Sequence, residues 1–134
     1  MSSAARRSRD LLGGALVLVV EDHEDSRELF RAMLECHGAI VMTAASVDEA
    51  KRVIEVVRPR VIVTDIGLRQ KPGTWLLDDL RRTSRYASIP IIAVTGREVP
   101  PSMAAMFDGF LKKPVDIDDL CGTVLRLLRG RLAS

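Results

Sequence analysis

Short continuous apolar runs alternate with amphipathic segments along most of the chain. The runs are ALVLVV, AIVMTA, VIVTD, PIIAVT and GFLKK, at residues 15–20, 39–44, 61–65, 90–95 and 109–113. Runs of this length that are rich in β-branched residues are typical of strands buried on both faces. Parallel strands need crossover connections, and these are usually helices. The alternation therefore predicts an α/β domain with a five-stranded parallel sheet, doubly wound by helices on both faces.

The intervals between the runs carry helix signals. Ser46 and Glu49 form a candidate capping box, and Gly38 and Pro59 are stop signals for the first two helices. The segment TWLLDDLRRT predicts a third helix. The last helix follows Asp116 and has the clearest apolar stripe: Ile117, Leu120, Cys121, Val124, Leu127 and Leu128.

Length and composition indicate one domain, which we place at residues 14–131. A chain of 134 residues with 47% hydrophobic content can bury a sizeable core. Residues 1–13 are expected to be a disordered basic leader. The apolar run after them is far shorter than the roughly 20 residues of a membrane span, and no cleavage site follows it. We therefore expect a cytoplasmic protein with no membrane partner, and a net charge of +2 gives no support for a nucleic-acid partner.

A few conspicuous side chains receive structural interpretations. Cys36 and Cys121 lie in helical patterns and are expected to be buried thiols. Trp75 is expected to be a packing residue, and His23 a solvated residue of a first helical turn.

Polar side chains stand where the predicted strands end. Glu21 and Asp22 follow the first strand, and Asp65, Thr95 and Lys113 end the third, fourth and fifth. Ligand sites of doubly wound sheets lie outside the carboxyl ends of the strands. We therefore expect these five side chains to converge on one site.

The residue types of this site suggest phosphoryl transfer. Three carboxylates brought together repel one another unless a cation joins them, and Mg²⁺ prefers such oxygen ligands. Asp65 could then act as the nucleophile that forms an aspartyl phosphate. The Lys113 ammonium and the Thr95 hydroxyl are suited to bind phosphoryl oxygens.

Four motifs together resemble a known family. VVED (19–22), VIVTDIGL (61–68), AVTG (93–96) and FLKKPV (110–115) resemble, in this order, the receiver domain of bacterial two-component response regulators. The resemblance implies a flavodoxin-like (βα)5 fold with strand order 2-1-3-4-5. It also implies that Asp65 accepts a phosphoryl group from the phosphohistidine of a partner histidine kinase or phosphotransfer protein.

The resemblance further assigns roles to single residues. It implies that Mg²⁺ is bound by Asp22 and Asp65, by Glu21 through water, and by the backbone carbonyl of Gly67. 

At the other side of the site, Thr95 and Phe110 fall at the positions of the family's switch pair. The Lys113–Pro114 bond falls at the position of its cis peptide.

The chain also departs from the family's usual pattern. The family usually has Met-Pro where Leu68-Arg69 stands, and Asp-Gly where Pro72-Gly73 stands. No group expected to take part in the chemistry is missing.

The interval between Thr95 and Lys113 is about one helical turn shorter than usual, and Pro100-Pro101 predicts a stunted fourth helix. Met103, Met106 and Phe107 would then be less well covered than in a full helix. We expect a downstream effector protein to bind residues 97–110 and the last helix.

These features favour a signalling switch rather than an enzyme that acts on an outside substrate. The alternatives are a pseudo-receiver that binds proteins without being phosphorylated, and a receiver fragment of a hybrid histidine kinase or a longer regulator. A homodimer is also left open. A nucleotide-binding domain is disfavoured, because acidic residues replace the glycine-rich phosphate loop after the first strand.

Overall fold

The computed structural model describes residues 11–133, which form a parallel five-stranded sheet with helices on both faces. The strands are β1 (Leu16–Val20), β2 (Ile40–Ala44), β3 (Val61–Asp65), β4 (Ile91–Thr95) and β5 (Gly109–Lys112). Their order in the sheet is β2-β1-β3-β4-β5, and every neighbouring pair is parallel. The predicted doubly wound fold and its strand order are confirmed, and each strand begins within one residue of its predicted start.

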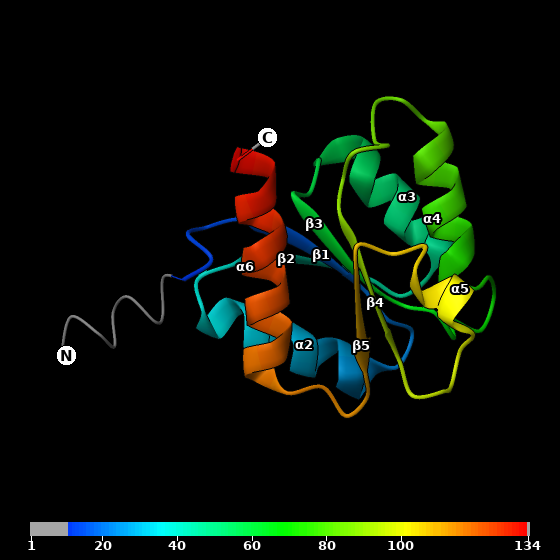
Figure 1. Ribbon diagram of the computed structural model, residues 1–134, viewed down its shortest axis with the longest axis horizontal. Coiled ribbons are helices and arrows are strands. Elements are labelled where there is room, and N and C mark those ends of the chain that lie inside the picture. The colour runs from blue at the N-terminus through cyan, green and yellow to red at the C-terminus, as the bar shows by residue number, and fades with distance from the viewer. Residues whose placement is uncertain (1–10, 134) are drawn as a thin grey trace, which may run out of the picture.

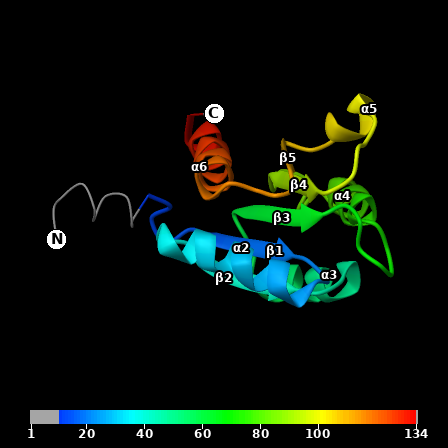
Figure 2. The same cartoon turned by 90° about the horizontal axis from the view of Figure 1, so that it is seen from below.

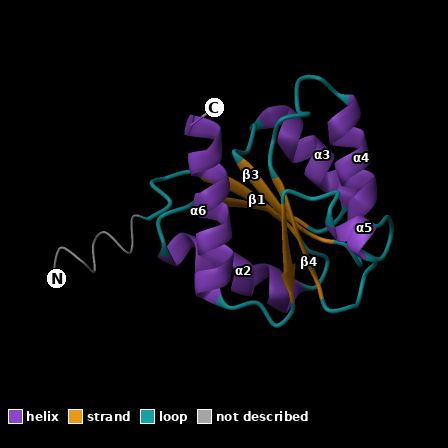
Figure 3. Cartoon of the chain, viewed as in Figure 1, coloured by secondary structure: helices purple, strands orange, loops and turns teal. Residues whose placement is uncertain are grey.

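The helices form two layers around this sheet (Figure 1). They are α2 (Glu24–Cys36), α3 (Val47–Val56), α4 (Gly73–Arg82), α5 (Pro101–Ala104) and α6 (Ile117–Ala133). In Figure 3 the strands lie between α2 and α6 on one side and α3 and α4 on the other. The view from below in Figure 2 shows the short α5 beyond the end of β4, next to α4.

Each face of the sheet has its own apolar core, because successive side chains of a strand point to opposite faces. Val17, Val19 and Val63 face α2 and α6, where they pack with Phe30, Leu34, Leu120 and Val124. Leu18, Val20 and Ile62 face α3 and α4, where they pack with Ile54, Leu76, Leu77 and Leu80. Full burial of one such side chain contributes about 1.5–3 kcal/mol. These two layers fix the sheet and hence the positions of its strand ends.

Side-chain caps set the helix starts that lie next to the site. Ser46 Oγ accepts from the Glu49 N–H at 3.1 Å, and Glu49 Oε2 accepts from the Ala45 N–H at 3.1 Å. The predicted capping box is thus present. His23 is exposed, as expected, and it is also the N-cap of α2, where its Nδ1 accepts from the Ser26 N–H at 3.4 Å.

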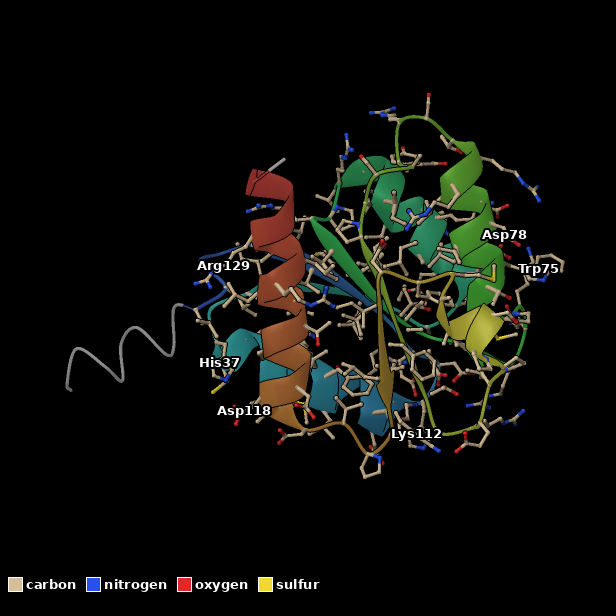
Figure 4. The ribbon with its side chains drawn as sticks, in the orientation of Figure 1. His37, Trp75, Asp78, Lys112, Asp118 and Arg129 are labelled. Atoms are coloured by element: carbon tan, nitrogen blue, oxygen red, sulfur yellow. The ribbon has the colours of Figure 1, made fainter. Side chains whose placement is uncertain are left out.

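Two packing interpretations were wrong. Trp75 is 53% exposed and points away from α4 (Figure 4), with Lys71 Nζ 5.6 Å from its ring centroid. The buried residues of α4 are Gly73, Leu76, Leu77 and Leu80, a helical stripe that passes beside position 75. Cys36 is exposed because it lies off the buried stripe of α2, whereas Cys121 is buried as expected.

The first described residues belong to the packed domain. The expected leader covered residues 1–13, of which 1–10 lie outside the described residues. Leu12 is only 3% exposed, and its N–H donates to the His37 carbonyl at 2.9 Å. Leu12 therefore packs in the α2/α6 core, although the expected leader included it.

The helix between β4 and β5 is short, as Pro100-Pro101 predicts. Helix α5 has four residues and begins at Pro101. Met106 is 47% exposed, and Met103 is partly buried. Phe107 corrects our expectation, because it is only 7% exposed and belongs to the α3/α4 core.

Within residues 11–133, no helix has the length and apolar character needed to cross a membrane.

The close packing of the first residue of α4, Gly73, against the end of β3 can be tested by substitution. A Cβ at position 73 would lie 2.3 Å from the Asp65 carbonyl oxygen, whereas a Cβ at Gly122 in α6 would have nothing within 4 Å. Gly73→Ala should therefore lower the free energy of unfolding by about 1–3 kcal/mol through overpacking. Gly122→Ala should raise it by about 0.5–1 kcal/mol through helix propensity. Urea unfolding of both variants checks this, and a neutral Gly73→Ala would contradict the close contact.

Candidate functional site

The carboxyl ends of four strands bring the predicted side chains together at one edge of the sheet. Asp65 is the last residue of β3 and Thr95 the last of β4, and the Lys113 N–H donates to the Thr95 carbonyl at 2.8 Å. Glu21 and Asp22 directly follow β1. In Figure 4, Lys112 marks this end of β5.

Three carboxylates lie in contact range of one another. Glu21, Asp22 and Asp65 each offer one carboxylate oxygen, and these oxygens all lie within 4.8 Å of one another. The exposed fractions of the three side chains are 1%, 18% and 13%, respectively. Glu21 Oε2 is buried and has no hydrogen-bond partner. A buried oxygen without a donor is costly, and a bound cation or water molecule beside this atom would remove that cost.

Lys113 bridges two of these carboxylates. Its Nζ lies 3.0 Å from Asp65 Oδ2 and 3.1 Å from Glu21 Oε1, and it stands 5.8 Å from the centroid of the Phe30 ring. The preceding strand places the ammonium there, because Lys113 immediately follows β5. The Lys113–Pro114 peptide bond is cis.

Glu21 has the most perturbed acidity of the three. Burial and, after it, the hydrogen bond and charge of the neighbouring Asp65 carboxylate raise the pKa of Glu21 to about 7, although Lys113 acts in the opposite direction. Glu21 is therefore partly protonated near neutral pH in the metal-free protein.

The pKa values of Asp65 and Lys113 shift in the directions that keep both side chains charged. Burial raises the pKa of Asp65, but hydrogen bonds from Glu21, the Gly67 N–H and Lys113 outweigh burial and hold it below its usual value. Burial lowers the pKa of Lys113, yet its contacts with Asp65 and Glu21 bring it above its usual value. The site therefore presents an ionised Asp65 carboxylate beside a fixed ammonium.

Of the remaining predicted residues, Gly67 and Thr95 lie at the same end of the sheet, whereas Phe110 lies within β5. The Gly67 N–H donates to Asp65 Oδ1 at 2.8 Å. Thr95 is 2% exposed, and its Oγ1 accepts from the Arg97 N–H at 3.2 Å. Phe110 is partly buried and packs on the edge of the α3/α4 core.

Two arginines complete the site and were not assigned to it from the sequence. Arg27 Nη1 donates to the Glu21 carbonyl at 3.0 Å, which fixes the turn between β1 and α2. The Arg69 backbone N–H and Nε both donate to Asp22 Oδ2, at 2.9 and 3.2 Å. The only signal in the sequence was that Arg69 stands where a proline is usual.

The donor set fits a hard divalent cation better than a soft one. All three side chains offer carboxylate oxygens, and no histidine or cysteine belongs to the cluster found among the described residues. Asp65 in turn has each of its two oxygens oriented by a donor, Gly67 or Lys113. Such an ionised and oriented carboxylate is suited to act as a nucleophile.

Known proteins share both the sequence pattern and the fold. The family model described as the response regulator receiver domain matches residues 17–125. An uncharacterized 14.6 kDa protein of Leptolyngbya boryana is 34% identical over 104 residues, which cover 75% of this chain and 79% of that protein. The response regulator Rre1 of a Synechocystis strain is 32% identical over 123 residues, covering 88% of this chain. The match covers 53% of Rre1, so the chain spans about half of that relative.

Solved structures give the same result. A CheY-like response regulator receiver domain from Methanospirillum hungatei superposes with a TM-score of 0.80 at 26% identity, over 89% of this chain and 97% of that one. The receiver domain of the sensor histidine kinase PA1611 from Pseudomonas aeruginosa has a TM-score of 0.80 at 25% identity, over 87% and 99% of the two chains. That structure is described as having a magnesium ion coordinated in the active site cleft.

Strand order, the acidic cluster bridged by a lysine, and the match over residues 17–125 agree with one another. The chain belongs to the response regulator receiver domain family of two-component signalling.

Proposed function

We propose that this chain is a phosphoacceptor that receives a phosphoryl group on Asp65 from the phosphohistidine of a histidine kinase or phosphotransfer protein. The observation that carries the proposal is the setting of Asp65: it is 13% exposed, ionised, and held by Gly67 and Lys113. An Asp65 oxygen would attack phosphorus while the nitrogen–phosphorus bond breaks, and its electron pair would remain on the imidazole of the donor.

Mg²⁺ is the cofactor that this site fits. Asp22 and Asp65 would hold it directly, Glu21 through water, and Gly67 through its backbone carbonyl. Bound there, the ion would supply charge neutralisation for the phosphoryl oxygens. The unpartnered Glu21 Oε2 supports this assignment, because a nearby cation or its water would satisfy that atom.

The other side chains of the site would hold and sense the phosphoryl group. The Lys113 ammonium already points at Asp65 and would pair with a phosphoryl oxygen. The Thr95 hydroxyl would turn toward the same group and release the Arg97 N–H. Phe110 would then move into the space that Thr95 leaves, and so alter the surface formed by residues 97–110 and α6, where we place the effector.

The pseudo-receiver alternative has less support. A module that had lost the switch would not need an ionised aspartate, a bridging lysine and a buried threonine at the same strand ends. Whether the chain acts alone or within a longer regulator or a hybrid kinase does not change this chemistry. The match to the sensor kinase CckA of Brucella abortus covers 13% of that protein, whereas the match to the 14.6 kDa protein of Leptolyngbya boryana covers 79% of that protein.

Phosphorylation of Asp65 can be tested by intact mass. With acetyl phosphate and Mg²⁺, the wild-type mass should rise by one phosphoryl group. Asp65→Asn should show no gain, because an amide is a far poorer nucleophile than a carboxylate. Asp78→Asn is the control, since Asp78 lies exposed on α4 next to Trp75 (Figure 4) and should label like wild type. Labelling that persists in Asp65→Asn would place the acceptor elsewhere.

The raised pKa of Glu21 predicts a pH-dependent stability. In the metal-free folded protein this group titrates at about 7, against 4.5 in the unfolded chain, so the folded state retains a proton that the unfolded state has released. The resulting stabilisation is complete below pH 4.5 and is lost as the pH rises to about 7. It amounts to at most about 3 kcal/mol.

Urea unfolding of wild type and Glu21→Gln across this range, with chelator present, measures the effect. The difference in unfolding free energy between the two proteins should change with pH, because glutamine does not titrate. Mg²⁺ should reduce the loss of stability that wild type shows as the pH rises, since a cation favours the ionised carboxylate. Parallel curves for the two proteins would show that Glu21 titrates normally.

The switch can be followed by hydrogen exchange. Beryllofluoride with Mg²⁺, a phosphoryl mimic, should change exchange at residues 97–110 in wild type. Thr95→Ala should lose this distant response while still binding the mimic, because the hydroxyl that couples the two regions is gone. Thr83→Ala, which removes an exposed hydroxyl bonded to Asp79, is the control. Changes confined to Asp65 and Glu21 in wild type would rule out this route.

A further inference from the structure

Arg69 holds the carboxylate that the proposed cation would use. Its backbone N–H and its Nε both donate to Asp22 Oδ2, at 2.9 and 3.2 Å. The guanidinium side chain is 78% exposed, whereas the Asp22 side chain is 18% exposed. The carboxylate is therefore part of the site, while the arginine reaches it from the solvent side.

The chain around Arg69 fixes the arginine in this place. Leu68 is 6% exposed and packs in the α3/α4 core, so the residue that follows it starts from an anchored position. Lys71, two residues further on, pairs with Asp48 at 2.9 Å and not with the site. In this described loop, Arg69 is therefore the cation that contacts the carboxylate cluster, whereas Lys71 contacts Asp48.

A divalent cation and Arg69 cannot both bind Asp22 without cost. Two positive groups on one carboxylate repel each other, and a charge-assisted hydrogen bond must weaken when the oxygen shares its electron density with a metal ion. There is space for the displaced guanidinium group. A cavity of about 360 Å³ lies beside it, lined by Asp22, Ser46, Glu49, Arg69 and Lys71 among others. The Glu49 carboxylate in its wall could receive the arginine.

We propose that Arg69 is an internal counter-ion of Asp22 that competes with Mg²⁺ and lowers the affinity of the site for the ion. This inference rests on the proposed metal site. Arg69 is a positioning residue: it acts on the carboxylate of Asp22 and takes no part in the transfer itself. In the metal-free protein it offsets the charge of the Asp22 carboxylate, which lies close to the carboxylates of Glu21 and Asp65.

The Mg²⁺ dissociation constant of the purified full chain, measured by calorimetric titration without a phosphodonor, tests the competition. Arg69→Ala should bind Mg²⁺ about two- to fivefold more tightly than wild type, the range expected for the loss of one exposed ion pair. Arg69→Lys should return the constant toward the wild-type value, since it keeps the positive charge. Lys71→Ala is the matched control, because it removes one positive charge from the same loop without touching Asp22, and it should change the constant less than Arg69→Ala.

A second readout separates competition from general damage. In chelator, Arg69→Ala should melt at a lower temperature than wild type, because Asp22 loses its counter-ion. The rise in melting temperature on adding Mg²⁺ should be larger in Arg69→Ala than in wild type. A merely structural role for Arg69 would lower the melting temperature without tightening Mg²⁺ binding.

The outcomes distinguish this inference from the function it rests on. Equal dissociation constants for wild type, Arg69→Ala and Lys71→Ala would overturn the competition and leave the metal site intact. An equal gain in Arg69→Ala and Lys71→Ala would also overturn it, because the effect would then be general electrostatics. No Mg²⁺ binding by either wild type or Arg69→Ala would remove the metal site itself. In chelator, Asp22→Ala should abolish the difference in melting temperature between arginine and alanine at position 69.

Discussion

The bond of Lys113 to Glu21 and Asp65 is the interaction on which the geometry of the site depends. Three carboxylates at one sheet edge repel one another, and Glu21 is almost completely buried. One ammonium within 3.1 Å of two of them offsets much of this cost. Since Lys113 follows the edge strand β5, the same contact links β5 across β4 to the ends of β1 and β3. A change of charge at Asp65 would therefore directly alter the ion pair with Lys113 at the end of β5.

Much of this arrangement could be predicted because it follows from strand periodicity. Buried parallel strands give continuous apolar runs, and the residue that ends each run lies at the carboxyl edge of the sheet. Glu21, Asp65, Thr95 and Lys113 converge for this reason alone. The two-layer core could also be predicted from the sequence, because the apolar residues of α3 and α6 repeat at the helical period.

What could not be predicted depends on loop paths and on side-chain rotamers. Nothing in the spacing of Arg69 and Asp22 indicates contact, because 47 residues separate them. The need for glycine at position 73 arises from the backbone of Asp65 rather than from any local pattern. The error at Trp75 has a different origin. The stripe of Leu76, Leu77 and Leu80 leaves position 75 on the outer side, so strict helical spacing would have placed the indole outside.

Charge balance gives the site its order of events in the proposed reaction. In the metal-free protein the pKa of Glu21 is raised, and Asp65 and Asp22 are paired with Lys113 and Arg69, so much of the negative charge of the cluster is offset. Binding of a divalent cation would favour the departure of Arg69 from Asp22 and the ionisation of Glu21, because each change would offset part of the added positive charge. A phosphoryl group on Asp65 would add negative charge, which Lys113 and the ion would offset. Because a largely buried site cannot hold several uncompensated charges, the ion would have to bind before the phosphoryl group arrives.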